Sequence, residues 1–172
     1  HVHTQIIGSV RQLCAAAETA AKKLGYECVF LTDCLSAEAS DTGRELAREL
    51  LRYRGSGRKI ALIAGGETVV HVKGKGKGGR NQELALAAAE AINGMKGVIV
   101  AAAGSDGTDG PTDAAGGYVD YTTAAELKAQ GIEIFDVLKQ NDAYHALQKV
   151  GGLVFTGPTG TNVNDVAVAL LG

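Results

Sequence analysis

Aromatic residues are scarce in this sequence: they make up 5% of its 172 residues, and tryptophan is absent. Proteins that bind single-stranded nucleic acid use aromatic side chains as stacking platforms, so such a function is not expected. The formal net charge of −2 and the isoelectric point near 6.1 argue against a module that binds duplex nucleic acid. No apolar run approaches the roughly 18 residues of a membrane-spanning helix, so no membrane partner is expected either.

Cysteine is also rare. The three cysteines, Cys14, Cys28 and Cys34, are odd in number and lack the spacing of a metal site. We interpret them as reduced thiols and expect a cytoplasmic protein. The sequence has neither an initiator methionine nor a signal peptide, and we therefore expect a part of a longer polypeptide.

Small residues, by contrast, are abundant, with 27 alanines and 24 glycines. This composition suits helices that pack closely on a sheet. Hydrophobic periodicity predicts strands over residues 5–8, 27–32, 59–64, 68–72, 97–102, 153–155 and 165–170. It predicts helices over residues 11–24, 42–53, 81–92, 122–130 and 142–150.

The order of these elements indicates the fold class. Strands and helices alternate through residue 64, which is typical of a parallel sheet covered by helices. The strands on either side of residues 65–67 are too close for a crossover helix, so that pair is expected to be antiparallel. We predict one α/β domain, a three-layer α/β/α fold with a mixed, mostly parallel sheet. Residues 1–57 would form a βαβα segment and residues 58–172 a second region.

The first of three candidate functional loops, here called the glycine loop, spans residues 72–83. It leaves a predicted strand, enters a predicted helix and carries four cations: Lys73, Lys75, Lys77 and Arg80. Glycines allow backbone N–H groups to approach an anion, and the helix N-terminus adds its dipole. The candidate residues for a phosphate or a carboxylate are therefore Gly78, Gly79, Arg80, Asn81 and Glu83. Gly74, Gly76 and Gly79 also match a dinucleotide-binding pattern, but the hairpin context and the lack of a ribose-binding acid count against it.

The second, the acidic loop, spans residues 103–117 and follows the most apolar predicted strand. Its carboxylates, Asp106, Asp109 and Asp113, are spaced three and four residues apart, so that a turn could gather them. Such carboxylates suit Mg²⁺ or a general base, and we take Asp106 and Asp109 as candidate metal ligands. The alternative is that aspartate and glycine here only form turns and caps.

The third, the C-terminal loop, spans residues 155–165 and consists of small hydrogen-bonding residues and glycines. Thr159, Asn162 and Asp165 are its candidate ligand-binding residues, because hydroxyl and amide groups can surround phosphates or hydroxyls. A long connection held by its own side chains is the other interpretation. Glu67, at the tip of a predicted strand, is either a turn residue or an acid that faces the site.

With these loops, the chain resembles the C-terminal part of class II glycerate kinases, the family sometimes called hydroxypyruvate reductases, and its MOFRL domain. The matching segments are residues 65–68, 78–83, 104–116, 141–144 and 156–165. The second region, residues 58–172, corresponds to MOFRL. The opening segment, with residues 6–9 and 24–26, is similar to the stretch that precedes MOFRL in these proteins.

The resemblance implies transfer of the γ-phosphoryl group of ATP to the 2-hydroxyl of D-glycerate with Mg²⁺, in a cleft between two α/β domains. Arg80 would stabilise the transferred phosphate, Asp106 and Asp109 would serve the metal or the hydroxyl, and the C-terminal loop would line the cleft. The family's large N-terminal domain is missing from these 172 residues, so we expect it as a partner and expect the chain alone to be inactive. A homodimer is possible.

Two other functions remain open. One is an NAD(P)H-dependent hydroxypyruvate reductase, which the family's older name and the glycine pattern favour. The other is a non-catalytic module that binds anions. Binding of ADP that requires Mg²⁺ would favour the kinase, and binding of NADH without Mg²⁺ would favour the reductase.

Overall fold

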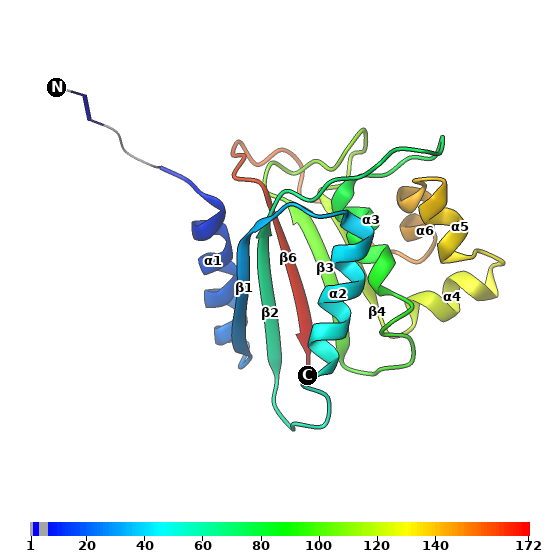
Figure 1. The fold of residues 1–172 in the computed structure, drawn as a ribbon, viewed down its shortest axis with the longest axis horizontal. Coiled ribbons are helices and arrows are strands. Elements are labelled where there is room, and N and C mark those ends of the chain that lie inside the picture. Colours follow the sequence, from blue (N-terminus) through cyan, green and yellow to red (C-terminus); the bar gives the residue numbers. More distant parts are fainter. Residues whose placement is uncertain (1, 4–6) are drawn as a thin grey trace.

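A computed structural model describes residues 2–3 and 7–172 of the chain. Within them, one six-stranded sheet has the strand order β1-β2-β6-β3-β4-β5 (Figure 1). The strands are β1 (Glu27–Leu35), β2 (Ile60–Gly66), β3 (Val98–Gly104), β4 (Gly116–Asp120), β5 (Leu153–Val154) and β6 (Asp165–Leu171). The helices are α1 (Val10–Lys23), α2 (Ala39–Leu51), α3 (Arg80–Ala88), α4 (Thr123–Ala129), α5 (Ile134–Lys139) and α6 (Ala143–Lys149).

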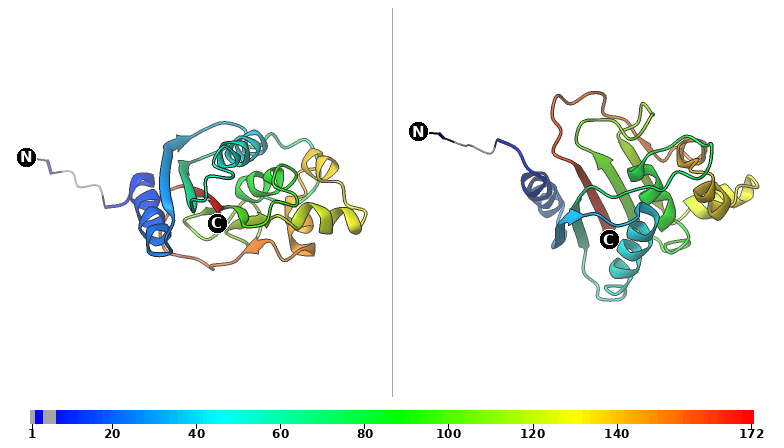
Figure 2. Two further views of the ribbon diagram at one scale, coloured as in Figure 1. Left: turned by 90° about the horizontal axis from the view of Figure 1, so that it is seen from below. Right: turned by 45° about the horizontal axis from the view of Figure 1, so that its top comes forward.

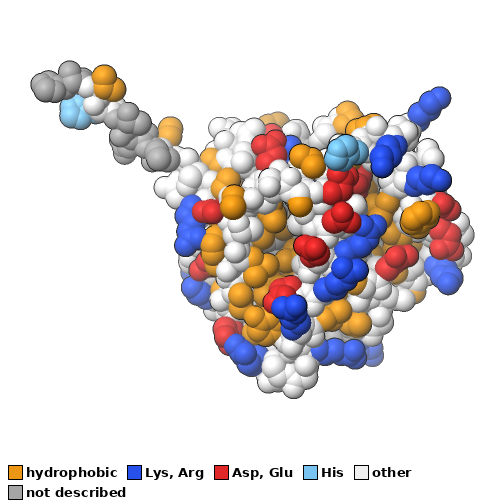
Figure 3. Space-filling view, viewed as in Figure 1, with side chains coloured by type: hydrophobic (Ala, Val, Ile, Leu, Met, Phe, Trp, Pro, Cys, Tyr) orange, Lys and Arg blue, Asp and Glu red, His pale blue; other side chains and the backbone are white. Residues whose placement is uncertain are grey.

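Helices cover both faces of the sheet, which confirms the predicted α/β class with a mixed, helix-covered sheet (Figure 2). On one face, Gly65 of β2 lies against Val10 and Cys14 of α1, where a side chain would have no room. On the other face lie α2 and α3, and α4, α5 and α6 follow beyond the β4 side (Figure 1). Charged side chains of both signs cover the outer face of α2, whereas Leu46 and Leu50 are buried beneath it (Figure 3).

The prediction that the sheet is mostly parallel is wrong. Only β1 and β2 pair in parallel among the described strands, and the pairs β2–β6, β6–β3, β3–β4 and β4–β5 are antiparallel. The cause is β6, the last strand of the chain, which inserts between β2 and β3 and runs opposite to both. Local periodicity detects a strand at this position but carries no information on where in the sheet it inserts.

Most predicted elements lie within a few residues of observed ones. Among the described residues, one predicted strand is absent and two short observed elements were not predicted. The segment 68–72 is not a strand: Val69 forms one isolated bridge with Glu38, at the start of α2. Two short elements, β4 and α5, were not predicted, because they are five and six residues long and lack a clear hydrophobic period. Of the predicted strand over residues 5–8, residues 5 and 6 lie outside the described residues, and Ile7 and Gly8 are not in a strand.

The core explains why α3 is held rigidly. Every residue of α3 after Arg80 is buried, because α2, the sheet and the helices α5 and α6 surround it. Every residue of β2 is buried as well. A helix enclosed on nearly all sides cannot shift without disrupting its neighbours, so its N-terminus is a fixed point in the molecule. No helix among residues 2–3 and 7–172 is long and apolar enough to cross a membrane.

Gly43 sets how closely α2 and α3 approach, because a Cβ atom there would collide with the carbonyl oxygen of Leu84. Helix propensity alone predicts that Gly43→Ala stabilises the protein by about 1 kcal/mol. We expect the opposite sign, a loss of about 1–3 kcal/mol in the free energy of unfolding, because the buried backbone of α3 cannot move away. Urea denaturation measures the change. Arg48→Ala, on the exposed side of α2, is the control and should change stability by less than about 0.5 kcal/mol.

Candidate functional site

A cavity of about 920 Å³ opens at the end of the sheet where β2 and β3 end and α3 begins. All three loops identified in the sequence contribute to its lining. The described lining residues are Glu67, Thr68, Val69, Val70, Val72, Gly76, Gly78, Gly79, Arg80, Glu83, Asp106, Thr108, Asp109, Gly110, Pro111, Asn141 and Asn162. This set contains one cation, Arg80, and four carboxylates. The cavity is therefore rich in negative charge around a single arginine.

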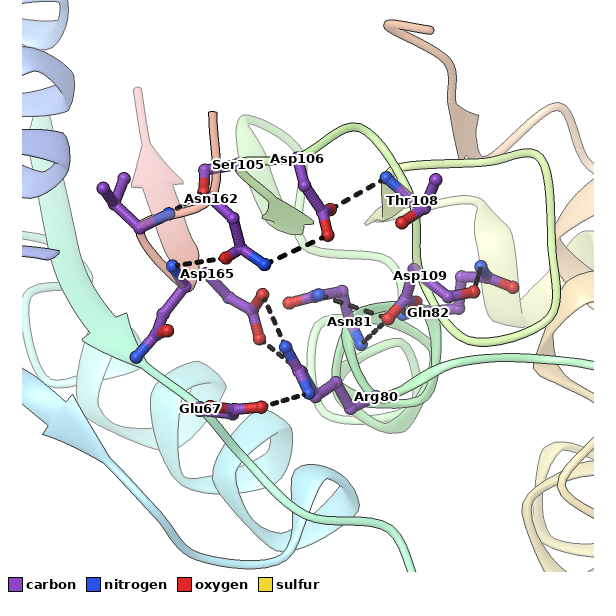
Figure 4. Close-up of polar contacts among 12 residues, drawn as sticks. Glu67, Arg80, Asn81, Gln82, Ser105, Asp106, Thr108, Asp109, Asn162 and Asp165 are labelled. Carbon is purple, nitrogen blue, oxygen red and sulfur yellow. Dashed lines mark hydrogen bonds and ion pairs between the residues drawn. The ribbon is translucent and has the colours of Figure 1, made fainter. Parts of the chain in front are cut away.

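Arg80 is the first residue of α3, and two carboxylates hold its guanidinium group (Figure 4). Its Nε donates to Oδ2 of Asp165 over 2.6 Å and its Nη2 to Oδ1 over 3.2 Å, so Asp165 binds one edge of the group with both oxygens. Its Nη1 donates to Oε1 of Glu67 over 2.7 Å. The hydrogen bonds with Asp165 and the nearby carboxylates raise the pKa of Arg80, which stays fully charged.

Asp109 caps the N-terminus of α3. Its Oδ1 accepts from the backbone N of Asn81 at 3.1 Å, and its Oδ2 accepts from that of Gln82 at 2.9 Å. The side-chain amide of Asn81 donates to the same Oδ1 over 3.2 Å. Gly79 precedes the helix without a side chain that could cap it, and it lies against the carboxyl group of Asp109. Asp109 is only 3% exposed, and this burial raises its pKa although the hydrogen bonds oppose the shift.

The three aspartates of the acidic loop have separate partners. The Oδ1 of Asp106 accepts from the backbone N of Thr108 at 3.0 Å, and its Oδ2 lies 3.5 Å from the amide nitrogen of Asn162 (Figure 4). Asp113 accepts from the hydroxyl of Tyr144 at 2.7 Å, and this hydrogen bond lowers the pKa of Asp113. In the described part of the chain, no three His, Cys, Asp or Glu side chains gather as a metal-binding group. The structure thus does not bring the three carboxylates to one point.

The glycine loop is bound to the turn between α5 and α6. The side-chain oxygen of Asn141 accepts from the backbone N of Lys73 at 2.8 Å and of Gly74 at 3.0 Å. The backbone N of Gly76 donates to the carbonyl oxygen of Gln140 over 2.8 Å. Gly74 and Gly76 pack so closely on this turn that a Cβ atom at either position would overlap residues 140–142. These glycines are therefore required for packing, and their N–H groups are not available to an anion.

The end of the glycine loop differs from its start. The backbone N–H groups of Gly78, Gly79 and Arg80 meet no acceptor within the residues that the structure describes, and all three residues line the cavity. Lys77 points elsewhere, since its Nζ lies 4.3 Å from the centre of the Tyr144 ring. Neither Lys73 nor Lys75 is among the lining residues. Of the four cations that the sequence placed in this loop, Arg80 is thus the one at the cavity.

The C-terminal loop is tied to the acidic loop. The hydroxyl of Thr159 donates to the carbonyl oxygen of Ser105 over 2.5 Å, and the backbone N of Val163 donates to the Ser105 hydroxyl over 2.8 Å. Asn162 reaches the cavity, and Asp165 lies beside it as the partner of Arg80. The predicted site residues of the three loops therefore meet at one end of the sheet, apart from Asp113.

Asn141 is a cavity-lining residue that was not predicted as a site residue. Its backbone φ is +54°, in the left-handed region that asparagine tolerates better than most residues. From this position its amide nitrogen donates to Oε2 of Glu83 over 3.2 Å while its oxygen holds the glycine loop. An asparagine directly before a helix was a weak signal. Thr68 and the three valines of the lining gave no signal of a functional site, because residues 68–72 have the pattern of a strand.

A helix-covered mixed sheet with an arginine fixed at a helix N-terminus, beside free N–H groups, defines an α/β domain with a candidate anion site. The chain belongs to the MOFRL family, whose model matches residues 60–165. The family that the sequence motifs suggested is thereby confirmed.

Longer enzymes are among its relatives. The chain is 51% identical to D-glycerate 2-kinase of Thermotoga maritima, covering 99% of this chain and 42% of that protein. It is 46% identical to glycerate 2-kinase of Pyrococcus horikoshii, covering 99% and 40%. A "putative hydroxypyruvate reductase" of Agrobacterium vitis is 36% identical, with 98% and 41% covered. A crystal structure of glycerate kinase from Thermotoga maritima superimposes with a TM-score of 0.95 at 51% identity, covering 99% of this chain and 42% of that one. The chain thus spans about two fifths of the length of these relatives.

Removal of the Asp109 carboxyl group tests its role as a cap. Asp109→Ala leaves two buried N–H groups at the start of α3 without an acceptor, and we expect a loss of about 2–4 kcal/mol in the free energy of unfolding. Asp109→Asn keeps one acceptor oxygen and should lose less. Urea denaturation measures both. Asp113→Ala, on the exposed part of the same loop, is the control, and an equal loss there would contradict the assignment.

The buried carboxyl group of Glu83 should make the stability of the protein depend on pH. Burial raises the pKa of its carboxyl group, while Asn141 and Arg44 oppose the shift and the charges of Glu38 and Asp109 add to it. The folded protein therefore binds this proton more tightly than the unfolded chain, and stability falls as the pH rises from the unfolded pKa through the folded one. Glu83→Gln keeps an acceptor for Asn141 and removes the charge.

We expect Glu83→Gln to raise Tm above that of the unaltered protein, and by more at pH 8 than at pH 5. Thermal unfolding at both values measures the difference. Glu90→Gln, at an exposed glutamate just after α3, should show no such pH dependence. A Tm difference that grows towards low pH would refute the assignment.

Proposed function

We propose that this chain supplies one side of the active site of a D-glycerate 2-kinase. The reaction would transfer the γ-phosphoryl group of ATP to the 2-hydroxyl of D-glycerate, which yields 2-phosphoglycerate, ADP and a proton. The names of the relatives support the reaction class. The observation that carries the proposal is the fixed guanidinium group of Arg80, which faces a large polar cavity at a helix N-terminus.

Arg80 would stabilise the negative charge of the phosphoryl group during its transfer. An arginine side chain has five N–H donors, and Asp165 and Glu67 together use three of those of Arg80. One of the two that remain is on Nη1 and the other on Nη2, the two nitrogens across which an arginine can bind two oxygens of one anion. Phosphoryl transfer depends mainly on positioning and on charge stabilisation, and an arginine held by a buried carboxylate supplies both.

The start of α3 would add further donors. Gly78, Gly79 and Arg80 line the same cavity, their N–H groups have no acceptor among the described residues, and helix N-termini favour negative charge. Asn81 is 2% exposed and bound to Asp109, so we assign it a structural role in holding this helix end. Asn162, and Thr159 behind it, would shape the opposite wall.

The donor set fits Mg²⁺ only in part. Asp106 is partly exposed and lines the cavity, so its carboxylate can supply one ligand. Asp109 fits less well than Asp106, because it is only 3% exposed and its oxygens already accept from N–H groups of α3. Mg²⁺ commonly binds one or two carboxylates together with phosphate oxygens, and we propose that it would reach this site with the nucleotide, where it would offset phosphate charge. The four carboxylates around one arginine support the need for such a cation.

The remaining walls of the site would come from the part of the longer relatives that this chain does not cover. A cavity open on one side cannot align two substrates for in-line transfer or keep water away from them. We therefore expect the 172 residues alone to bind anions without catalysing transfer.

The alternative of a dinucleotide-dependent reductase has less support. The backbone N–H groups of Gly74 and Gly76 are bonded to Asn141 and Gln140, so the start of the glycine loop cannot cradle a pyrophosphate. A module that only binds anions would share the Arg80 site but would show no turnover in any context. Activity therefore separates it from the kinase.

A chimera tests the proposal. The chain replaces the matching part of the Thermotoga maritima kinase, and release of ADP is followed with D-glycerate, ATP and Mg²⁺. We expect turnover, and a loss of about 100-fold or more in kcat for Arg80→Ala, because an oriented transition-state donor is removed. Arg80→Lys should be nearly as inactive, since lysine lacks the two-pronged geometry.

Three controls complete this experiment. Arg48→Ala, on the outer face of α2, should retain full activity in the chimera. The isolated chain should release no ADP, and rapid turnover by it would contradict the need for a second domain. Oxidation of NADH with hydroxypyruvate, in place of ADP release, would favour the reductase.

A further inference from the structure

The two carboxylates that bind Arg80 differ in how firmly they are held. The side chain of Asp165 is 8% exposed, lies at the start of the central strand β6 and contacts the guanidinium group through both oxygens. Glu67 is 55% exposed and contributes a single hydrogen bond, to Nη1 (Figure 4). Asp165 is thus a permanent partner of Arg80, whereas the Glu67 side chain is open to water on one side.

The backbone at Glu67 is nevertheless fixed. Its N–H group donates to the carbonyl oxygen of Leu35 over 2.8 Å, and that of Val69 donates to Ala37 over 3.0 Å. Gly66, with a φ of +139°, lies directly against the backbone of Leu35. Release of Glu67 from Arg80 therefore needs only rotation of its side chain, which is fast and leaves the sheet unchanged.

Glu67 also accepts from Nη1, one of the two nitrogens of Arg80 that an incoming anion needs. Asp165 takes the edge formed by Nε and Nη2, so two oxygens of a phosphate or a carboxylate can bind together only across Nη1 and Nη2. Glu67 sits on Nη1. The three side chains carry a formal net charge of −1 (one arginine and two carboxylates), which repels an anion as long as Glu67 stays.

We propose that Glu67 is an exchangeable counter-ion, which the anionic group of the substrate displaces from Arg80. This inference rests on the proposed function in so far as it takes Arg80 as the anion site. Without a ligand, Glu67 accepts from one N–H group of Nη1. With a phosphate or a carboxylate bound, Glu67 turns to water, and the Arg80–Asp165 pair presents the three N–H donors of Nη1 and Nη2 that Asp165 does not use. Glu67 therefore weakens binding of every anion at this site and selects those with two oxygens that can replace it.

Binding of inorganic phosphate to the 172-residue chain, measured by isothermal titration calorimetry at low ionic strength, tests the proposal. Glu67→Gln removes the competing charge, and we expect its Kd for phosphate to fall by about fivefold, the size of one exposed ion pair. Raised salt should reduce this gain. Glu45→Gln, at an exposed glutamate of α2, is the matched control and should leave the Kd unchanged.

Arg80→Ala distinguishes failure of this inference from failure of the proposed function. If Arg80→Ala abolishes phosphate binding but Glu67→Gln leaves it unchanged or weaker, the exchange is refuted while the anion site stands. If phosphate binds equally well without the Arg80 side chain, or binds to neither the unaltered chain nor Glu67→Gln, both fail. Tighter binding in Glu67→Gln that depends on Arg80 supports both.

Discussion

The hydrogen bonds between Asp109 and the first turn of α3 are the interaction on which the site depends. Because α3 is buried from Asn81 onward, the N–H groups of Asn81 and Gln82 cannot be hydrated and need an acceptor from the protein. Gly79 offers none, and the acidic loop reaches across to supply one. This bond fixes the helix end that carries Arg80 and, at the same time, holds the acidic loop over the cavity. Asp106 reaches the cavity wall as a consequence.

The second constraint is electrostatic. One guanidinium group lies among several carboxylates, and the buried Asp165 acts as its orienting partner from the start of β6. Such an arrangement is a poor general attractant for anions, since its formal charge is negative. It suits a ligand that brings its own cation and that binds arginine through two oxygens. In the proposed function, a metal-bound nucleotide meets both requirements, whereas inorganic phosphate meets only the second and binds without the help of a cation.

The sequence predicted the long periodic elements and the loops that form the site, because both depend on local patterns. It could not predict the sheet order, since the position of β6 between β2 and β3 depends on contacts between residues about a hundred positions apart. The same limit applies inside the site. Arg80, Glu67 and Asp165 were each identified, but their ion pairs were not. Asp109 was taken as a candidate metal ligand because its spacing from Asp106 and Asp113 suggested a shared turn. Its hydrogen bonds to the start of α3 join residues 27 and 28 positions apart, which no local pattern reveals. Residues 68–72 have the composition of a strand but lie where no strand pairs with them.

The glycines of the glycine loop have two different roles, close packing and the supply of N–H donors, and the sequence pattern does not distinguish them. Gly74 and Gly76 match a nucleotide-binding pattern, yet they are required because the loop packs on residues 140–142 without space for side chains. Gly78 and Gly79, a few residues later, line the cavity, and their N–H groups have no acceptor among the described residues. Asn141 joins the two parts, because its oxygen fixes the start of the loop while its nitrogen binds Glu83 beneath the cavity. The packing that holds the loop against α5 and α6 therefore also sets the position of the donors at the start of α3.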